Sequence, residues 1–221
     1  MHHDPSTPIN RVHSLQTALT DRISGQDEVI ASVAASALAS LQGENSLKQP
    51  YSKFLALGSS GSGKVELTRT FSSHLFGESS PAENHYIRFD MSEYQTASSL
   101  GRLLGTQAND CGTLGLAHIR AKGYGTIVFD EIEKAHETVF KVLIHILFNR
   151  YVTLADARDL FFNRFFIFAT SNICSHFNGP PNEAKRHAYE TASAWFRPEV
   201  VSKFHNVLVF NKLPDESGCL S

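Results

Sequence analysis

Apolar residues are spaced along the chain in two ways. Short continuous apolar runs predict strands that are buried on both faces, and stretches with apolar residues every three or four positions predict amphipathic helices. The predicted strands cover residues 54–57, 86–89, 126–129, 161–170 and 207–210. The predicted helices cover residues 13–23, 27–41, 64–75, 92–104 and 116–122, with one that ends near 149 and a short one that ends at 204. Strands that alternate with helices favour the α/β class, with a parallel sheet covered by helices on both faces.

A glycine-rich turn joins the first predicted strand to the helix that follows it. The turn reads Gly58-Ser-Ser-Gly-Ser-Gly-Lys64, and its glycines allow backbone geometries that a Cβ atom would obstruct. Its N–H groups can point at phosphate oxygens, and Lys64 can reach the β- and γ-phosphates of a nucleotide. The alternative is a Gly/Ser-rich turn without a ligand. The candidate nucleotide-binding residues are Ser59, Ser60, Gly61, Ser62, Gly63, Lys64 and Val65.

One position departs from the phosphate-loop pattern G-x-x-x-x-G-K-[ST]. Val65 stands where a hydroxyl would coordinate the magnesium ion that bridges the β- and γ-phosphates. A valine side chain cannot bind a metal ion. The phosphate loop predicts ATP and Mg2+ as cofactors. Because Val65 has no oxygen, we expect magnesium to be held less firmly than in a complete phosphate loop.

Polar side chains follow two other predicted strands. Asp130 and Glu131 come directly after the strand at 126–129, and Asn172 follows the strand at 161–170. Ligands gather at the carboxyl ends of strands in open α/β sheets. Asp130 can hold magnesium through water, and Glu131 can orient and deprotonate an attacking water, while Asn172 can contact the γ-phosphate or that water. The alternative is that the two carboxylates only cap the next helix.

Composition narrows the class of protein. The chain has 221 residues, 42% hydrophobic and 19% charged, which is ordinary for a globular protein with a core. We expect one domain over residues 11–213, with flexible tails at residues 1–10 and 214–221. The net charge of −2 gives no general attraction to nucleic acid or to an anionic membrane, so we expect neither as a partner.

Cysteine and histidine usage bears on the compartment and on metal binding. The three cysteines include no C-x-x-C pair, and the N-terminus has no apolar signal region. The apolar runs are far shorter than the ~20 residues of a membrane span. These features favour a reducing intracellular compartment, the cytoplasm. The eleven histidines are scattered, so we do not expect a zinc site.

Six motifs together resemble a known family, the Clp family of AAA+ unfoldases. The resemblance is to the large ATPase subdomain, is strongest to the second module of ClpB-type disaggregases, and covers about residues 11–213. The motifs are Ile23-Ser-Gly-Gln-Asp27, Gly58 to Lys64, Arg88-Phe-Asp-Met-Ser-Glu-Tyr94, Asp130 to His136, Thr170-Ser-Asn172 and Phe196-Arg-Pro-Glu199. Taken together they are highly specific.

The resemblance implies a fold, a chemistry and a biological role. The fold is that of a phosphate-loop AAA+ ATPase, a three-layer sandwich with a five-stranded parallel sheet. Asp130 takes the magnesium-water role, Glu131 is the catalytic base and Asn172 is the γ-phosphate sensor. Ile23 and Gly25 lie near the adenine. Proteins of this kind are chaperones that form hexameric rings and thread polypeptide through a central pore with ATP hydrolysis.

The departures from the family pattern, beyond Val65, affect the pore, the catalytic site and the lid. The pore-loop tyrosine that grips substrate aligns with Asp110. Lys203 stands where a neighbouring subunit's arginine would reach the γ-phosphate, and it keeps the charge but loses the bidentate fork. The sequence also stops shortly after Leu213, before the family's helical lid.

Two hypotheses about function follow. The first is an ATP-dependent AAA+ module that hydrolyses ATP slowly in protein unfolding or quality control. The second is a degenerate pseudo-ATPase that binds or regulates by assembling with active AAA+ relatives, as a homo- or hetero-oligomeric ring. A stand-alone nucleotide or small-molecule kinase is disfavoured, because the sequence Asp130-Glu-Ile-Glu-Lys-Ala-His136 does not suit that class.

Overall fold

A computed structural model describes residues 7–43, 50–77, 85–174 and 181–212 of the chain. The predicted tail at 214–221 and the first six residues lie outside these ranges. In the described ranges, no helix is both long enough and apolar enough to cross a membrane.

Five parallel strands form the central sheet, in the order β2-β3-β6-β1-β7. Their bounds are β1 Ser52–Leu57, β2 Tyr86–Asp90, β3 Gly125–Asp130, β6 Phe165–Ser171 and β7 Asn206–Val209. Every residue of β1, β3 and β6 is buried, as their continuous apolar sequences predict. The α/β class and the five-stranded parallel sheet are therefore confirmed.

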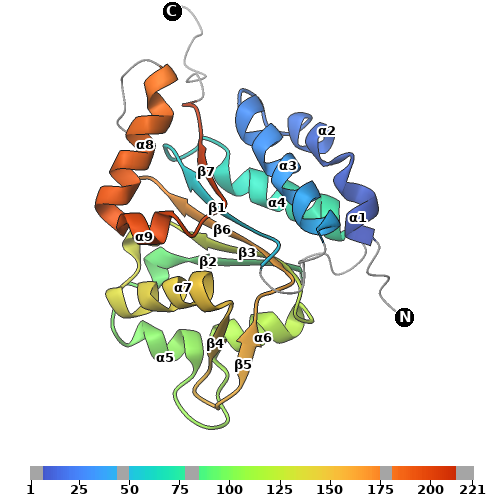
Figure 1. Ribbon diagram of the computed structural model, residues 1–221. Helices are drawn as coiled ribbons and strands as arrows, with labels where there is room; N and C mark the ends of the chain where they lie inside the picture. Colours follow the sequence, from blue (N-terminus) through green and yellow to red (C-terminus); the bar gives the residue numbers. More distant parts are fainter. Residues whose placement is uncertain (1–6, 44–49, 78–84, 175–180, 213–221) are drawn as a thin grey trace, which may run out of the picture.

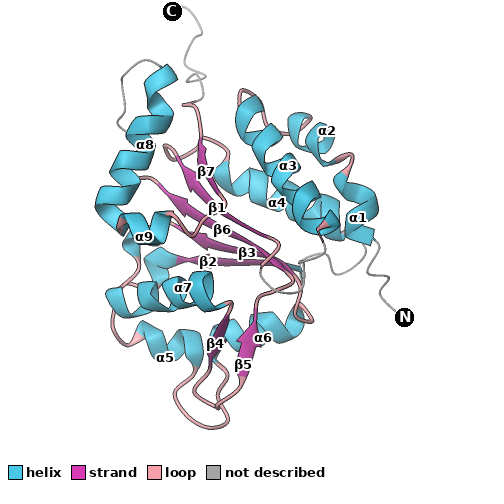
Figure 2. Cartoon of the chain, in the orientation of Figure 1, coloured by secondary structure: helices cyan, strands magenta, loops and turns pink. Residues whose placement is uncertain are grey.

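Helices cover both faces of the sheet, which gives three layers (Figures 1 and 2). One layer holds α1 Thr7–Val12, α2 Leu15–Thr20, α3 Asp27–Gln42 and α4 Lys64–Phe76. The other holds α5 Ser99–Leu104, α6 Gly112–Arg120, α7 Glu137–Asn149, α8 Pro181–Phe196 and α9 Pro198–Val201. Two 3₁₀ turns, η2 Met91–Glu93 and η3 Ile132–Lys134, follow β2 and β3, and a hairpin of β4 Tyr151–Thr153 and β5 Asp159–Phe161 follows α7.

Two predicted helices differ in extent from those in the structure. The helix predicted over 13–23 is shorter, α2 at Leu15–Thr20, and a separate helix, α1 at Thr7–Val12, precedes it. Between them, the N–H and hydroxyl of Ser14 both donate to the carbonyl of Arg11. Since α1 begins at Thr7, the predicted boundary between tail and domain falls inside a helix. The helix predicted over 92–104 is also wrong in extent, since Tyr94 turns its buried ring onto Phe89 and separates η2 from α5.

Three further segments differ from their predictions. Helix α6 begins at Gly112, four residues before the helix predicted over 116–122, because the Asp110 carboxylate accepts from the Gly112 N–H at 2.9 Å. The strand predicted over 161–170 is β5 and β6, separated by a turn in which Phe165 N–H donates to the Phe162 carbonyl. The hydrophobic pattern did not predict α8, since its buried face includes the small residues Ala188 and Ala192.

Aromatic residues fill the core between the sheet and the layer of α1 to α4. Phe54 of β1 and Phe168 of β6 are paired in register, and their rings stack with centroids 4.5 Å apart. Phe71 of α4 meets Phe168 edge-on at 5.2 Å. All three side chains are fully buried. Because β1 leads into the phosphate loop and α4 follows it, this cluster packs together the two elements that flank the loop.

The substitution Phe168→Ala should destabilise the fold by about 3–5 kcal/mol, since it removes a buried ring and leaves a cavity that packed neighbours cannot fill. Phe161→Ala is the matched control, because Phe161 is 56% exposed on β5. It should cost less than about 1 kcal/mol. Urea unfolding followed by circular dichroism measures both. Equal losses in the two variants would show that the aromatic cluster does not carry this part of the core.

Candidate nucleotide-binding site

The carboxyl ends of three neighbouring strands meet at one edge of the sheet. The turn at 58–63 follows β1, Asp130 and Glu131 stand at the end of β3, and Asn172 follows β6. A cleft of about 450 Å³ lies at this edge. It is lined by Ser60, Gly61, Gly63, Lys64, Val65, Glu66, Arg88, Asp90, Asp130, Glu131 and Asn172. Residues that are distant in the sequence are thus brought together as the sequence analysis expected.

The glycines of the turn have the roles that their positions suggested. Gly61 and Gly63 have φ values of +77° and +95°, in the left-handed region that other residues rarely adopt. At Gly58 a Cβ atom would lie 2.8 Å from the Cβ atom of Phe210, so only glycine fits beside the segment after β7. The loop therefore curls over the N-terminus of α4, where backbone N–H groups can bind an anion.

Lys64 is the centre of the hydrogen bonding in the cleft. Only 7% of the residue is exposed. Its Nζ donates to the carbonyls of Gly58 at 2.8 Å and Ser59 at 2.7 Å, and to Asn172 Oδ1 at 2.9 Å. Burial lowers the pKa of Lys64, and the nearby carboxylates oppose that shift only in part. A buried ammonium held by neutral oxygens is ready to exchange some of them for phosphate oxygens.

Asn172 and Glu131 continue this network across the cleft. Asn172 Nδ2 donates to Glu131 Oε1 at 2.7 Å, so the amide bridges Lys64 and Glu131. The other oxygen of Glu131 pairs with Lys134 at 2.6 Å. Glu131 has a left-handed backbone, with φ of 55°, and its N–H donates to the Thr170 hydroxyl at 3.0 Å. This strained residue is held firmly in place at the end of β3.

Asp130 is occupied by other side chains. It is 5% exposed, and its Oδ2 accepts from Arg88 Nε at 3.0 Å and from Arg88 Nη2 at 2.5 Å. Its Oδ1 accepts from the Thr170 hydroxyl. Val65, on the adjoining wall of the cleft, offers no oxygen. Both carboxylate oxygens of Asp130 are thus bonded to protein groups, and Val65 supplies no oxygen. These two residues therefore do not fit a magnesium ion held in the manner of a complete phosphate loop. In the described ranges, no three His, Cys, Asp or Glu side chains form a metal-binding group.

Sequence reasoning missed Arg88 and Thr170 as site residues, although both belong to motifs quoted for the resemblance. Arg88 lies on β2, which pairs with β3 so that Asp90 is opposite Asp130. A side chain two residues earlier on the same face of β2 can reach the end of β3. In the sequence, Arg88 could therefore have been found as a basic residue two positions before Asp90, the acidic residue at the end of a strand.

The segment before α3 lies against the phosphate loop. A Cβ atom on Gly63 would lie 3.5 Å from Ile23 Cγ2. Gly25 lines a second cavity, of about 240 Å³, together with residues of α3, α8 and the end of β7. Ile23 thus lies beside the loop and Gly25 lines a neighbouring cavity, while their role at an adenine stays a prediction.

Gln26 fixes this arrangement, and the sequence analysis did not select it. Its side chain is fully buried, and Nε2 donates to the carbonyls of Ser62 at 3.2 Å and Asn211 at 2.9 Å. Its Oε1 accepts from the Asn211 N–H at 2.9 Å. One amide therefore joins the segment before α3, the phosphate loop and the segment after β7.

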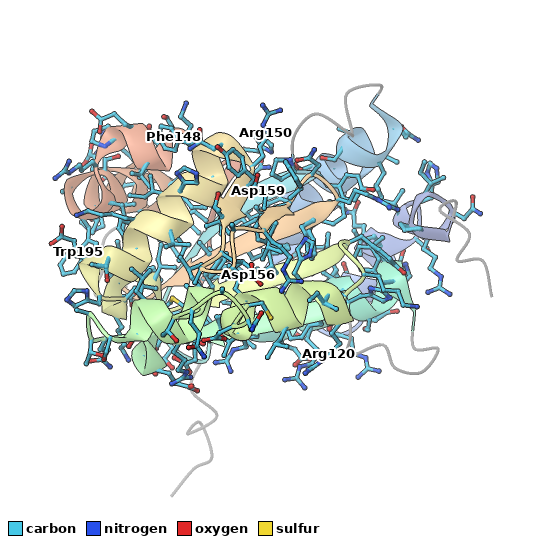
Figure 3. All side chains as sticks on the ribbon, turned by 90° about the horizontal axis from the view of Figure 1, so that it is seen from below. Arg120, Phe148, Arg150, Asp156, Asp159 and Trp195 are labelled. Atoms are coloured by element: carbon cyan, nitrogen blue, oxygen red, sulfur yellow. The ribbon has the colours of Figure 1, made fainter. Side chains whose placement is uncertain are left out.

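Lys203 is not brought to the cleft of its own chain. Its ammonium lies over the ring of Phe148, 4.5 Å from the centroid, at the C-terminal end of α7. Phe148 and Arg150 are at the molecular surface there (Figure 3). Lys203 can meet a γ-phosphate only if that phosphate is bound by another copy or another chain.

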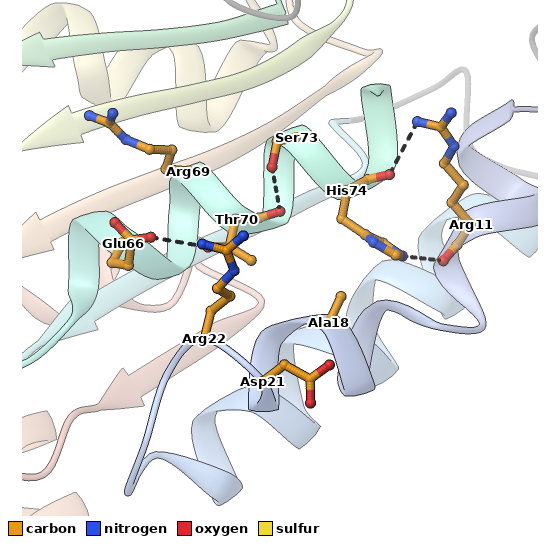
Figure 4. A pocket seen from close by; sticks show the side chains of 9 residues that line it. All are labelled: Arg11, Ala18, Asp21, Arg22, Glu66, Arg69, Thr70, Ser73 and His74. Carbon is orange, nitrogen blue, oxygen red and sulfur yellow. Dashed lines mark hydrogen bonds between the residues drawn. The ribbon is translucent and has the colours of Figure 1, made fainter. Parts of the chain in front are cut away.

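A larger hollow, of about 770 Å³, lies between α1, α2 and α4. Arg11, Arg22 and Arg69 line it, but Figure 4 shows their side chains pointing to different parts of the groove. His74 and Arg11 bond to each other's backbone carbonyls across one end. This hollow has none of the convergent groups of the cleft at the strand ends.

Comparison with known proteins agrees with this geometry. The model of the AAA domain (Cdc48 subfamily) matches residues 49–207. The chain is 31% identical to heat shock protein 100 of Trypanosoma brucei brucei, over 95% of this chain and 25% of that protein. It is 33% identical to the chaperone protein ClpB of Dichelobacter nodosus, over 92% and 24%. The chain thus spans about a quarter of the length of the curated relatives it matches.

Solved structures give the same result. The S. cerevisiae Hsp104-ADP complex matches with a TM-score of 0.77 and 27% identity, over 92% of this chain and 36% of that one. A closed state of Hsp104 with ATPγS and FITC casein matches with a TM-score of 0.76. The fold, the cleft and these similarities lead to one conclusion. The chain belongs to the AAA domain family (Cdc48 subfamily), as a Clp-type AAA+ ATPase domain.

Proposed function

We propose that this domain binds ATP in the cleft and hydrolyses it slowly, in protein unfolding or quality control. The observation that carries the proposal is the hydrogen-bonded series from Lys64 through Asn172 to Glu131. It connects a phosphate-binding cation, a side chain in the sensor position and a carboxylate able to accept a proton from water. The complexes of similar structures with ADP and ATPγS support an adenine nucleotide as the ligand.

The proposed chemistry uses groups that are already in position. Phosphate oxygens would replace loop carbonyls on Lys64 Nζ and accept from the N–H groups of the turn. The adenine would lie toward Ile23 and the cavity at Gly25. Asn172 would orient the attacking water with Glu131, which would take its proton. Because Lys134 pairs with one oxygen of Glu131 and Asn172 donates to the other, the carboxylate would have to release a partner before it met the water, and this supports slow turnover.

The second candidate is a pseudo-ATPase that binds nucleotide and acts by assembly. The pairing of both catalytic-position carboxylates with cations favours it: Asp130 is paired with Arg88 and Glu131 with Lys134. In either case we place the domain in the cytoplasm, in a ring with its own copies or with AAA+ relatives. Lys203 of one subunit would then act at the γ-phosphate of the next.

Polypeptide is the proposed substrate of such a ring, but not through an aromatic grip. Asp110, at the pore-loop position, uses its carboxylate to accept from the N–H groups of Thr106 at 3.0 Å and Gly112 at 2.9 Å. These backbone bonds lower its pKa and keep it ionised. The pore-loop position thus carries a carboxylate charge, whereas an aromatic side chain there would pack against any substrate side chain.

The substitution Lys64→Ala should weaken the binding of a fluorescent ATP analogue by at least about tenfold, because charge-assisted bonds to the phosphates are lost. Lys141→Ala is the control, since Lys141 is an exposed lysine of α7 that pairs with Glu137. It should bind as the parent does. The same affinity in the parent and in Lys64→Ala would exclude the turn as the binding site.

The substitution Val65→Thr should raise the factor by which magnesium tightens ATP binding, by about fivefold or more, because a hydroxyl ligand is restored beside Lys64. Titrations with and without magnesium measure this factor. Val65→Ala changes the same position without adding an oxygen and should not raise it. If the factor were unchanged in Val65→Thr, the valine would not explain a weak magnesium response.

The substitution Glu131→Gln should keep nucleotide binding and lower the rate of phosphate release by roughly a hundredfold or more, as expected for removal of a general base. Glu137→Gln, on the exposed start of α7, is the control and should hydrolyse at the parental rate. Phosphate release under single-turnover conditions is the measurement. No release from the parent itself would reject the enzyme and favour the binding module.

A further inference from the structure

Arg88 places a cation in the cleft, directly beside the carboxylate at the end of β3. It lies with Lys64, Val65 and Asp130 in the lining of the same 450 Å³ cleft. Its guanidinium binds one oxygen of Asp130 through two nitrogens, at 3.0 and 2.5 Å. Asp130 is the carboxylate that would otherwise stand beside a nucleotide-bound metal ion. A positive charge belonging to the protein is therefore placed where a divalent cation would be needed.

The orientation of Arg88 is fixed by a second carboxylate. Nη2 of Arg88 also lies 3.3 Å from Asp90 Oδ2. Asp90 is itself held, because its Oδ1 accepts from the N–H of Ser92 at 3.0 Å and from the Ser92 hydroxyl at 2.6 Å. The guanidinium is thus anchored on one side by two acids. Its side chain is still 37% exposed, so its remaining edge faces the open cleft.

Because of Val65, the pairing of Arg88 with Asp130 matters for metal binding. Without a hydroxyl at this position, a magnesium ion would have to displace Arg88 from Asp130 and gain no second protein oxygen from the loop. Magnesium requires near-octahedral oxygen ligation and gives up its water reluctantly. A guanidinium needs no such shell, keeps its charge at all relevant pH values and can bind phosphate oxygens in a bidentate manner.

We propose that Arg88, docked on Asp130, is the counter-cation for the β- and γ-phosphates, and that this domain binds nucleotide without a divalent metal ion. This inference rests on the proposed function, because it concerns the same cleft. It adds Arg88 to the nucleotide-binding residues. It also gives Asp130 a different role from the one its sequence position suggests, since the carboxylate positions Arg88 and does not hold a metal-bound water.

The test compares the affinity for a fluorescent ATP analogue in excess magnesium and in EDTA. The parent should bind with the same affinity in both, within about twofold. Arg88→Met should weaken binding in EDTA by at least about tenfold and should regain part of that loss in magnesium, because Asp130 is then free. Arg102→Met is the control: Arg102 is an exposed arginine that pairs with Glu93 outside the cleft, and it should match the parent in both conditions.

Arg88→Lys extends the test, because it keeps a cation next to buried Asp130 and protects the fold if Arg88→Met does not fold. Its affinity in EDTA should fall by about threefold or more, since one point charge replaces the fork. Thermal melting of each variant checks folding. The comparison of the parent's affinity in magnesium and in EDTA tests the inference without any variant.

Two results would overturn the inference. A parent that binds tenfold or more tightly with magnesium than in EDTA needs the metal, and Arg88 is then only a neutralising partner of Asp130. An Arg88→Met variant that folds and binds as the parent does in EDTA has the same meaning. In both cases binding that is lost in Lys64→Ala leaves the proposed function standing. If the parent binds in neither condition, both proposals fail together.

Discussion

A buried ammonium controls the organisation of the site. A charge removed from water costs several kcal/mol unless polar groups surround it, and Lys64 is surrounded by two loop carbonyls and the amide oxygen of Asn172. The carbonyls belong to the loop after β1 and the amide to the segment after β6. These two strands are neighbours in the sheet, with Leu57 opposite Ser171. One side chain therefore holds together the ends of two adjacent strands, β1 and β6.

The remaining charges in the cleft are arranged in pairs. Asp130 is bound by Arg88, and Glu131 by Lys134 and Asn172. The protein thus neutralises the carboxylates that the resemblance assigns to a metal ion and to water activation. A nucleotide entering such a cleft meets cations that are partly engaged already. This balance explains why phosphate binding is better supported by the geometry than fast hydrolysis.

The predictability of the fold followed the strength of the local signal. Strands β1, β3 and β6 were predicted because sheets covered on both faces demand continuous apolar sequence. The failures arose where a side chain overrode periodicity. Asp110 bonds to Gly112 at the start of α6, ahead of the helix predicted over 116–122. Ser14 bonds to the Arg11 carbonyl inside the helix predicted over 13–23, where the structure separates α1 from α2. The pattern did not reveal α8, because alanines on its buried face carry little hydrophobic signal.

By itself, the sequence determined the phosphate loop, the carboxylates after β3 and the asparagine after β6, because each lies within a few residues of a strong apolar run. The tertiary structure alone decided which groups these residues meet. Arg88 reaches Asp130 because β2 pairs with β3, and Thr170 reaches it because β6 pairs with β3 on the other side. Gln26 joins segments 185 residues apart, and Lys203 lies outside the cleft. Such contacts depend on strand order, which local sequence does not encode.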